Sequence, residues 1–378
     1  MQMAVSISWS GLLGLFSVLT LMTLARAAEG QFSYITNNGA ITITSSDPAS
    51  DPPEVINIPD TIDGMSVTAI RDYAFAQNEA LTYLTIANSV TNIGAFAFFY
   101  CTSLPRVTIP DSVISMGTQA FQDCASLTNA VIGKGLTNLT RSIFISCTNL
   151  AAIDVDPSNP YLSSFDGAVY DRNQSTLITC PQGKSGSYTI AQRTKTLSLG
   201  AFYRCINLMQ IALPNGLNTI ELGTFYQCYS LESIVIPNSV RTMGHSAFFQ
   251  CRSLSTAIFG NGITDIGKEC FQDCTALTEL ELPKNLNHFG EIAFLRCSGL
   301  TSVVIPKSVT SFDFAAFGLC TNLNSVYFLG NAPAAPGVCV FCYDTNAVAY
   351  YLPNTKGWSA TYSDMPTAQW SRKDAAHH

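Results

Sequence analysis

A repeat of 23 residues constrains the fold of this chain more than any other feature of its sequence. Periods of 20–50 residues are the signature of solenoids and related arrays. Phenylalanine recurs at this interval in ten units, and in nine of them a cysteine follows three residues later. The phenylalanine column is Phe75, Phe98, Phe121, Phe144, Phe202, Phe225, Phe248, Phe271, Phe294 and Phe317. The cysteine column is Cys101, Cys124, Cys147, Cys205, Cys228, Cys251, Cys274, Cys297 and Cys320. Ten units in one register predict a stack.

Each unit contains a strand followed by a turn. The segment 234–236 alternates isoleucine, valine and isoleucine, so only Val235 points away from the core. Pro237 ends this strand because it cannot donate to a ladder. Ala247 and Phe248 predict a tight helical turn before the column cysteine. One unit cannot bury its apolar edge alone, whereas stacked units with parallel strands about 4.8 Å apart can.

The shared frame is C-x-x-L-x-x-[VI]-x-[IL]-P-x-x-[VL]-x-x-[IMF]-x-x-x-A-F, as in residues 101–123, 228–250 and 297–319. This frame resembles the BspA-like bacterial leucine-rich repeats, and the resemblance extends over residues 55–329. It implies a β-rich α/β solenoid: a right-handed leucine-rich-repeat array with a parallel concave sheet and short helical turns on the convex side. It also implies a secreted or surface binding protein, with adhesion among the functions of relatives, and it implies no catalytic residue.

We expect a cap at each end of the solenoid, because an end unit must hide the outermost core layer. The N-terminal cap is predicted over residues 28–54, where an Asn-Asn-Gly turn joins two strand patterns in a hairpin. The C-terminal cap is predicted over residues 330–370, which begin with a Gly-Asn-Ala-Pro breaker and contain Trp358 and Trp370. Residues 371–378 are expected to be a disordered tail.

The repeat is interrupted once, between Cys147 and Cys205, by an insertion at about residues 156–189. This insertion lacks the A-F-x-x-C turn, and its pattern indicates a hairpin around residues 172–175. It is either a decorated repeat that keeps the sheet continuous or a projecting contact loop. We favour the decorated repeat, because insertions in a chain are tolerated thermodynamically.

The N-terminus predicts export. Residues 11–24 form an apolar run of 14 residues, which is shorter than the span of about 20 that a membrane helix needs. A small-x-small pattern follows, so we expect residues 1–27 to be a signal peptide cleaved after Ala27. The mature chain is then secreted or at the cell surface, without a transmembrane span. The alternative is an uncleaved anchor, because residues 6–25 approach the length of a span.

Composition excludes two classes of protein. The net charge is −7, only 12% of the residues are charged, and no basic run occurs. Nucleic acid is therefore not an expected partner, since binding to phosphates needs clustered Lys and Arg. The hydrophobic fraction of 47% excludes a wholly disordered chain.

The cysteine column predicts buried free thiols rather than a metal or disulfide array. Side chains one repeat apart are parallel, so they do not converge on a point as metal ligands do. Their Cβ atoms also lie farther apart than the roughly 3.8 Å that a disulfide prefers. Asn78 takes the first place of the column, so a small polar side chain also fits there. Cys339 and Cys342 form a C-x-x-C in the C-terminal cap, where a local disulfide fits better than redox chemistry. We predict neither a metal nor a cofactor.

The sequence carries no catalytic motif of the G-x-S-x-G, H-E-x-x-H or glycine-rich phosphate-loop type. His245 and His288 occupy different places in their units, so they do not stack. Glu279 and Glu281 are close enough for a carboxylate pair, but a solvated strand face explains them more simply. We therefore predict that the protein is not an enzyme. An enzymatic site would have to be grafted on the insertion or the C-terminal cap.

Strand residues that point away from the core form the surface that solenoids use for binding. Val235, Ile258 and Val304 are predicted to lie near one another on this surface, with only Glu281 between them. Contiguous exposed apolar patches mark interaction sites, although β-branched residues also favour strands for their own reasons. The predicted partner-binding residues are Val235, Ile258, Glu279, Glu281, Val304 and Tyr327. The favoured function is recognition of a protein surface, and the alternative is binding of a carbohydrate or of the cell envelope.

Overall fold

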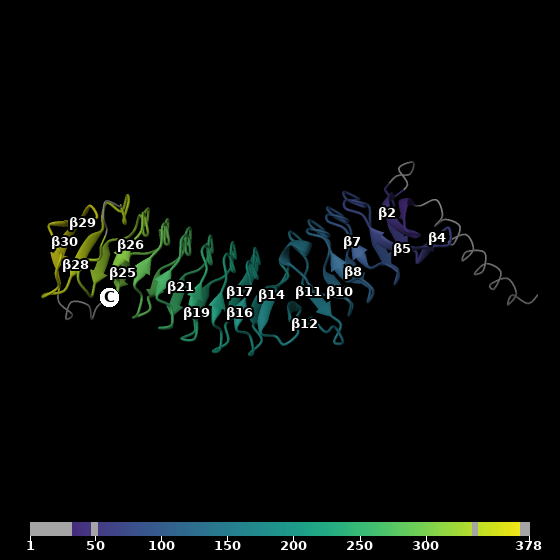
Figure 1. Ribbon diagram of the computed structural model, residues 1–378. Coiled ribbons are helices and arrows are strands. Elements are labelled where there is room, and N and C mark those ends of the chain that lie inside the picture. Colours follow the sequence, from purple (N-terminus) through teal and green to yellow (C-terminus); the bar gives the residue numbers. More distant parts are fainter. Residues whose placement is uncertain (1–31, 47–51, 335–338, 371–378) are drawn as a thin grey trace, which may run out of the picture.

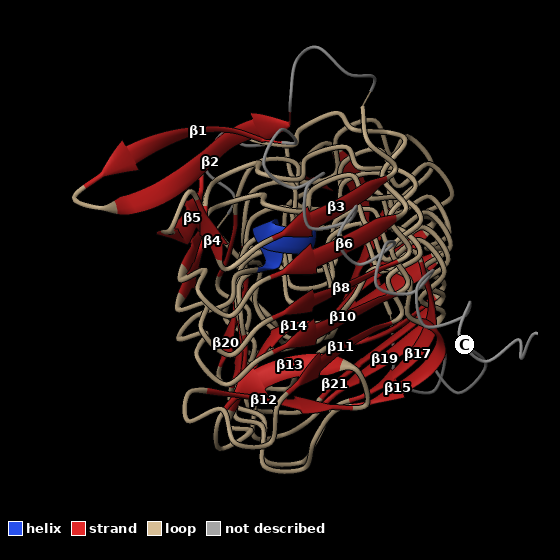
Figure 2. Cartoon of the chain, turned by 90° about the vertical axis from the view of Figure 1, so that its right-hand side faces the viewer, coloured by secondary structure: helices blue, strands red, loops and turns tan. Residues whose placement is uncertain are grey.

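The computed structural model describes residues 32–46, 52–334 and 339–370. These residues form a β-solenoid of about 13 turns with the leucine-rich-repeat fold, drawn from purple to yellow in Figure 1. The one helix among them is the four-residue 3₁₀ helix η1 (Arg141–Phe144), blue in Figure 2. The expected α/β label therefore fits poorly. Since η1 is so short, no helix in the described residues could cross a membrane.

The first strand of each turn belongs to a parallel ladder that runs along the stack. Within each sheet of this ladder, successive strands pair in register, so that Val235 lies opposite Ile258 and Val304 opposite Tyr327. Most inward residues of these strands are buried and most outward ones are partly or fully exposed, as the alternation predicts. The strands are β3 (Val55–Ile58), β6 (Tyr83–Ile86), β8 (Arg106–Ile109), β10 (Asn129–Ile132), β11 (Ala152–Val155), β15 (Ser185–Thr189), β17 (Asn207–Ala212), β19 (Ser233–Ile236), β21 (Thr256–Phe259), β23 (Glu279–Glu281), β25 (Ser302–Ile305), β27 (Ser325–Phe328) and β28 (Val348–Tyr351).

A second set of parallel pairings, divided among three sheets, joins strands that come after the first strand of each turn. It contributes another side of the solenoid, which is visible end-on in Figure 2. The strands are β5 (Met65–Ile70), β7 (Asn92–Ile93), β9 (Ser115–Met116), β14 (Thr176–Thr179), β16 (Thr196–Leu197), β18 (Thr219–Ile220), β20 (Thr242–Met243), β22 (Asp265–Ile266), β24 (His288–Phe289) and β26 (Ser311–Phe312).

The A-F-x-x-C segments are turns, and the predicted helical turns are a correction to the sequence analysis. In the unit that ends at Cys251, both Ser246 and Gln250 adopt left-handed backbone angles, with φ of 54° and 58°. Two left-handed residues within five positions prevent a continuous right-handed helix. The segment instead directs alternate N–H groups to the next unit, as when Phe248 donates to the carbonyl of Cys270 at 2.8 Å. This bonding adds a third ladder along the stack.

The phenylalanine column forms the centre of the core. Phe225, Phe248 and Phe271 are fully buried, and consecutive rings stack with centroids 4.9 Å apart. The column extends beyond the ten predicted members, because Phe341 stacks on Phe317 at 5.5 Å. The ring stack therefore continues past the last regular repeat.

All nine column cysteines are free and buried, which confirms the prediction of unbridged thiols. Most of their thiols donate to the carbonyl of a column phenylalanine in the preceding unit. Cys251 Sγ, for example, donates to the Phe225 oxygen at 3.1 Å, which also accepts from the Cys228 N–H at 3.2 Å. Asn78 makes the corresponding bond at the start of the column, to the Pro53 carbonyl at 2.9 Å.

Hairpins lie at both ends of the described stack. The N-terminal pair β1 (Phe32–Asn37) and β2 (Ala40–Ser46) is antiparallel and projects beyond the body in Figure 2. A short strand, β4 (Thr61–Ile62), pairs with β5. At the other end, β30 (Met365–Gln369) pairs with β28 in parallel and with β29 (Thr361–Tyr362) in an antiparallel hairpin. Their role as caps stays a prediction.

Other predicted features of the ends have different outcomes. Cys339 and Cys342 are joined by a disulfide. The predicted signal peptide, residues 1–27, and the predicted tail, residues 371–378, lie outside the described residues. The handedness of the solenoid and the concave position of its first sheet also stay predictions.

The insertion is part of the stack and divides its core in two. Its strands β12 (Leu162–Phe165) and β13 (Ala168–Asp171) form an antiparallel hairpin, and β13 also pairs with β14. Val169 belongs to the apolar cluster of the N-terminal units, whereas Ala168 and Tyr170 belong to that of the C-terminal units. Because successive side chains of a strand face opposite sides, β13 separates the two apolar cores.

Candidate binding face

The outward residues of the first ladder form rows across the strands. In one row Val235, Ile258 and Glu281 are paired neighbours on β19, β21 and β23. In this row Val235 is 59% exposed, Glu281 is also exposed, and Ile258 is half-buried. Glu279, in the parallel row, is exposed and accepts a hydrogen bond from Thr256 at 3.1 Å.

A second part of the same face lies on β25, β27 and β28. Val304 is 48% exposed and lies opposite Tyr327, which in turn lies opposite Tyr350. The rings of Tyr327 and Tyr350 stack at 5.2 Å, and the Trp370 ring meets Tyr327 edge-on at 4.9 Å. Tyrosine and tryptophan are enriched at interfaces, where they bury large rigid surfaces. Trp370 itself is buried. Sequence reasoning did not place Tyr350 on this face, because Tyr350 follows the last regular repeat.

The two parts are separated by an opening in the ladder. Within the described residues the first ladder is interrupted between β6 and β8, between β11 and β15, and between β23 and β25. The third interruption leaves a groove of about 460 Å³. Its lining residues are Leu280, Glu281, Leu282, Lys284, Val304, Pro306, Lys307 and Leu329.

The structure thus brings the six predicted residues onto one face in two groups. Val235, Ile258, Glu279 and Glu281 lie on the β19–β23 side of the groove, and Val304 and Tyr327 lie on the β25–β27 side. Their part in binding a partner stays a prediction. The groove between the groups could not be found from the sequence, because the frame continues through it unchanged, and leucine also stands at the equivalent places in other units, as Leu84 and Leu213.

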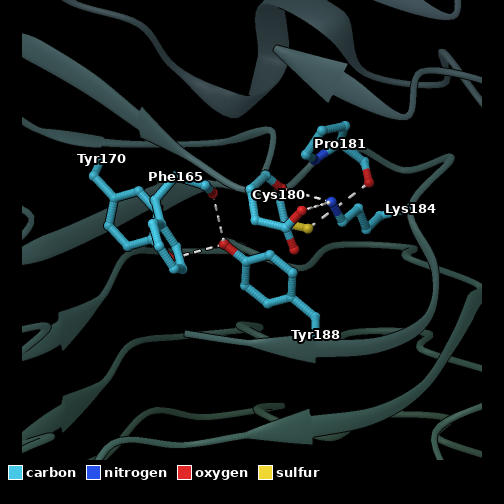
Figure 3. A network of polar contacts seen from close by, with 7 residues as sticks. Phe165, Tyr170, Cys180, Pro181, Lys184 and Tyr188 are labelled. Carbon is cyan, nitrogen blue, oxygen red and sulfur yellow. Dashed lines mark hydrogen bonds and ion pairs between the residues drawn. The ribbon is translucent and has the colours of Figure 1, made fainter. Parts of the chain in front are cut away.

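The insertion holds a buried polar network, shown in Figure 3. Tyr170 Oη and Tyr188 Oη are 2.8 Å apart, Tyr188 donates to the Phe165 carbonyl at 3.2 Å, and the Ala191 N–H donates to Tyr170 Oη at 3.3 Å. Each hydroxyl can therefore donate once and accept once. Burial raises the pKa of both tyrosines, so both stay neutral. A fully satisfied neutral network ties β13 to β15 and offers no reactive group.

A salt bridge and a cysteine complete the insertion. Lys184 Nζ lies 2.8 Å from Asp166 Oδ1 and 5.5 Å from the centroid of the Tyr188 ring (Figure 3). Cys180 takes the place of a column phenylalanine, because its N–H donates to the Ala201 carbonyl as the N–H groups of column residues do in other units. A cavity of about 20 Å³ lies beside Cys180 and Phe144, which is room for about one water molecule.

One cluster has the residue types of a hydrolase but not its surroundings. His288 Nδ1 is 2.9 Å from Ser311 Oγ, and His288 Nε2 is 3.2 Å from Asp313 Oδ2. Sequence reasoning missed it because it compared the histidines with each other and not with residues 23 positions away. The Asp313 side chain is 54% exposed, and none of the three residues lines the grooves and cavity described above. Catalysis also needs oxyanion donors and a place for substrate, so we interpret these contacts as cross-strand pairs.

Titratable groups elsewhere on the stack act structurally. Arg296 donates to Asp273, with Nη2 2.7 Å from Oδ2, and this hydrogen bond holds the pKa of Asp273 below its usual range. Both residues immediately precede a column cysteine, so the pair links adjacent turns. Within the described ranges, no group of three or more His, Cys, Asp or Glu side chains could hold a metal ion.

Comparisons with known proteins agree with this architecture. A family model described as a BspA type leucine rich repeat region, in six copies, matches residues 68–185 and 186–328. The structure of a leucine-rich repeat protein from Bacteroides ovatus is similar, with 23% identity, a TM-score of 0.56 and coverage of 90% of this chain and 98% of that chain.

Two further structures have lower scores. A leucine-rich repeat protein from Eubacterium ventriosum has 21% identity and a TM-score of 0.49, covering 77% of this chain and 93% of that chain. A leucine rich cell surface protein from Faecalibacterium prausnitzii has 20% identity and a TM-score of 0.46, covering 80% and 94%. No match was found among curated proteins.

Proposed function

We propose, from the premise that this chain belongs to the BspA-type leucine-rich repeat family, that it is a non-enzymatic, exported binding protein. It recognises a protein surface through the outward face of its first ladder, in an adhesion-type or other protein–protein interaction. The protein is located outside the cell, either secreted or at the cell surface. The family membership supports a binding role, since stacked repeats present extended surfaces for partners.

The observation that carries this proposal is the composition of the outward face between β19 and β28. Val235 and Val304 expose apolar side chains on either side of an apolar groove, and Tyr327 and Tyr350 extend the surface toward the C-terminal end. An exposed apolar surface of this kind costs solubility unless a partner covers it. Aromatic side chains with a polar tip favour a protein partner.

The test is affinity capture with the mature chain and a variant in which Val235, Ile258 and Val304 are changed together to serine. We expect the variant to have the melting temperature of the wild type, because these side chains point away from the core. We also expect it to capture less of the partner protein. A matched variant changes the outward Val131 on β10 to serine and should retain capture. If the triple variant still captures the protein, the proposal is contradicted. It is also contradicted if the chain binds material from an extract depleted of protein and a glycan competes for that binding.

A further inference from the structure

The opening between β23 and β25 has two strand edges without a ladder partner. Residues 279–281 of β23 pair with β21, and β25 pairs with β27, but the described strands contain no pairing between β23 and β25. The stack stays closed on its other sides, since the Phe271 N–H still donates to the Ala293 carbonyl at 2.7 Å. The opening is therefore a wedge on the outward face. A strand edge with free N–H and C=O groups is a template for an added extended segment.

The floor of this wedge is apolar. Leu280 and Leu282 occupy inward strand positions, yet both are only partly buried, whereas the equivalent Val303 and Ile305 on β25 are fully buried. Together with Leu329 they line the groove of about 460 Å³. Pockets of several hundred Å³ accommodate large side chains or small ligands. The groove has room for at least one leucine- or phenylalanine-sized side chain.

Three charged side chains line the wedge, namely Glu281 and two lysines that lack acidic partners. Lys284 and Lys307 are both exposed, and neither forms an ion pair within the described part of the chain. Lys134 and Lys268 behave differently, since they lie 2.8 Å from Asp111 and Glu291. Two lysines against one glutamate give the wedge a net positive charge in a chain whose net charge is −7. This charge beside an apolar floor favours a ligand with a negative group next to an apolar one.

We propose that this wedge docks an extended peptide segment of a protein partner, with one large apolar side chain on Leu280, Leu282 and Leu329 and a carboxylate between Lys284 and Lys307. The main chain of the segment pairs with an open strand edge, which supplies affinity without sequence preference, while the pocket and the lysines supply specificity. This inference rests on the proposed function and names the chemistry of its partner.

The test selects peptides from a displayed random library on the immobilised mature chain. We expect enrichment of segments in which a large apolar residue lies within three positions of Asp or Glu. Binding of a selected peptide should fall at least about tenfold, or 1.4 kcal/mol, in the double variant Lys284→Glu, Lys307→Glu. A peptide whose acidic residue is changed to Lys should regain affinity for this variant. Lys195→Glu, which reverses an exposed lysine away from the wedge, should change nothing.

Two outcomes would overturn the inference. One is selected peptides without acidic residues, and the other is unchanged affinity in the double variant while its melting curve matches the wild type. If a protein partner is lost by the serine triple variant but retained by the lysine double variant, the wedge is not its site and the proposed function stands. If neither variant affects any bound protein, both proposals fail.

Discussion

The column cysteines show how a single residue type serves a whole stack. A thiol is small and apolar enough for the core, and it is also a weak hydrogen-bond donor. In the structure it gives the phenylalanine carbonyl of the preceding unit a second donor, as Cys274 does to Phe248 at 3.2 Å. Alanine would fit this place without making the bond. Packing and hydrogen bonding therefore explain the recurrence of cysteine, and no reactive thiol is needed to explain it.

The column thiols should react slowly in the folded protein. Burial raises the pKa of Cys251, Cys274 and Cys297 well above its usual range, and the thiolate is the reactive form. We expect slow labelling by a thiol reagent in buffer at pH 8 and near-complete labelling in denaturant. Mass spectrometry that found consecutive column cysteines bridged would contradict this account.

Asp344 takes the place of a cysteine in the turn that follows Cys320. This assignment follows from the backbone, because the Leu319 N–H donates to the Cys342 carbonyl as equivalent residues do in earlier units, and Phe341 continues the ring stack. Asp344 is 5% exposed, and neither carboxylate oxygen makes a hydrogen bond of good geometry in the described structure, so that the Cys320 backbone N–H offsets the effect of burial on the pKa only in part. Burial raises the pKa of Asp344 to about 7. Of the titratable groups near it, the one coupled to its charge is the Cys320 thiol.

This carboxyl should make stability depend on pH. Its folded-state pKa of about 7 lies above the ordinary value of 3.8, so the folded state binds more protons. The stabilisation is fully present below about pH 4 and is lost as the pH rises through about 7. Relative to Asp344→Asn, the wild type should lose about 2–4 kcal/mol of unfolding free energy between pH 4 and pH 8.

Urea titrations across this pH range measure the difference. Asp344→Cys, which restores the thiol of the other units, should behave like Asp344→Asn, and the exposed Asp265→Asn should follow the wild type. Parallel pH profiles for the wild type and Asp344→Asn would show that the carboxyl does not titrate in this range.

Among the elements, the A-F-x-x-C turn matters most for stability, because it carries the ring stack and the third ladder. Phe248→Ala removes a fully buried ring that stacks on both neighbours at 4.9 Å. We expect a loss of about 3–5 kcal/mol of unfolding free energy, as for other large core truncations. Phe314→Ala, at a site 52% exposed, should cost far less. Equal melting temperatures for Phe248→Ala and the wild type would refute the packing.

The stability of the insertion should depend on the hydrogen bonds between Tyr170 and Tyr188. Tyr188→Phe leaves the Phe165 carbonyl and the Tyr170 hydroxyl without the partner they share. An unsatisfied buried polar group costs about 1–3 kcal/mol. Chemical denaturation should show a loss of this size, whereas Tyr203→Phe, outside the network, should be neutral. No loss in Tyr188→Phe would mean that water replaces the network.

The regular repeats of the fold could be predicted from the sequence, whereas the places where the structure departs from the 23-residue period could not. The frame predicted the strands, their parallel stacking, the direction of Val235 and the free thiols. It did not predict left-handed Ser246 and Gln250, because neither residue type marks such a turn as glycine does. Phe341 was missed because it follows Phe317 by 24 residues rather than 23. The groove depends on the missing pairing between β23 and β25, which no single unit encodes.

At the scale of the whole molecule, β13 separates two apolar cores and the candidate face lies on only one of them. Val235, Ile258 and Val304 belong to strands whose inward residues lie in the C-terminal core. The stack is long and curved in Figure 1, so a partner of ordinary size can cover only part of it. The account therefore assigns recognition to the units after the insertion and gives the earlier units a supporting role.

Hydrogen exchange of the chain with and without its captured protein partner tests this assignment most directly. The account predicts that protection on binding is concentrated in β19–β28, with its maximum on the strands that border the groove, β23 and β25. Protection confined to the β1–β2 hairpin, to β8–β11 or to the insertion strands β12–β14 would contradict it.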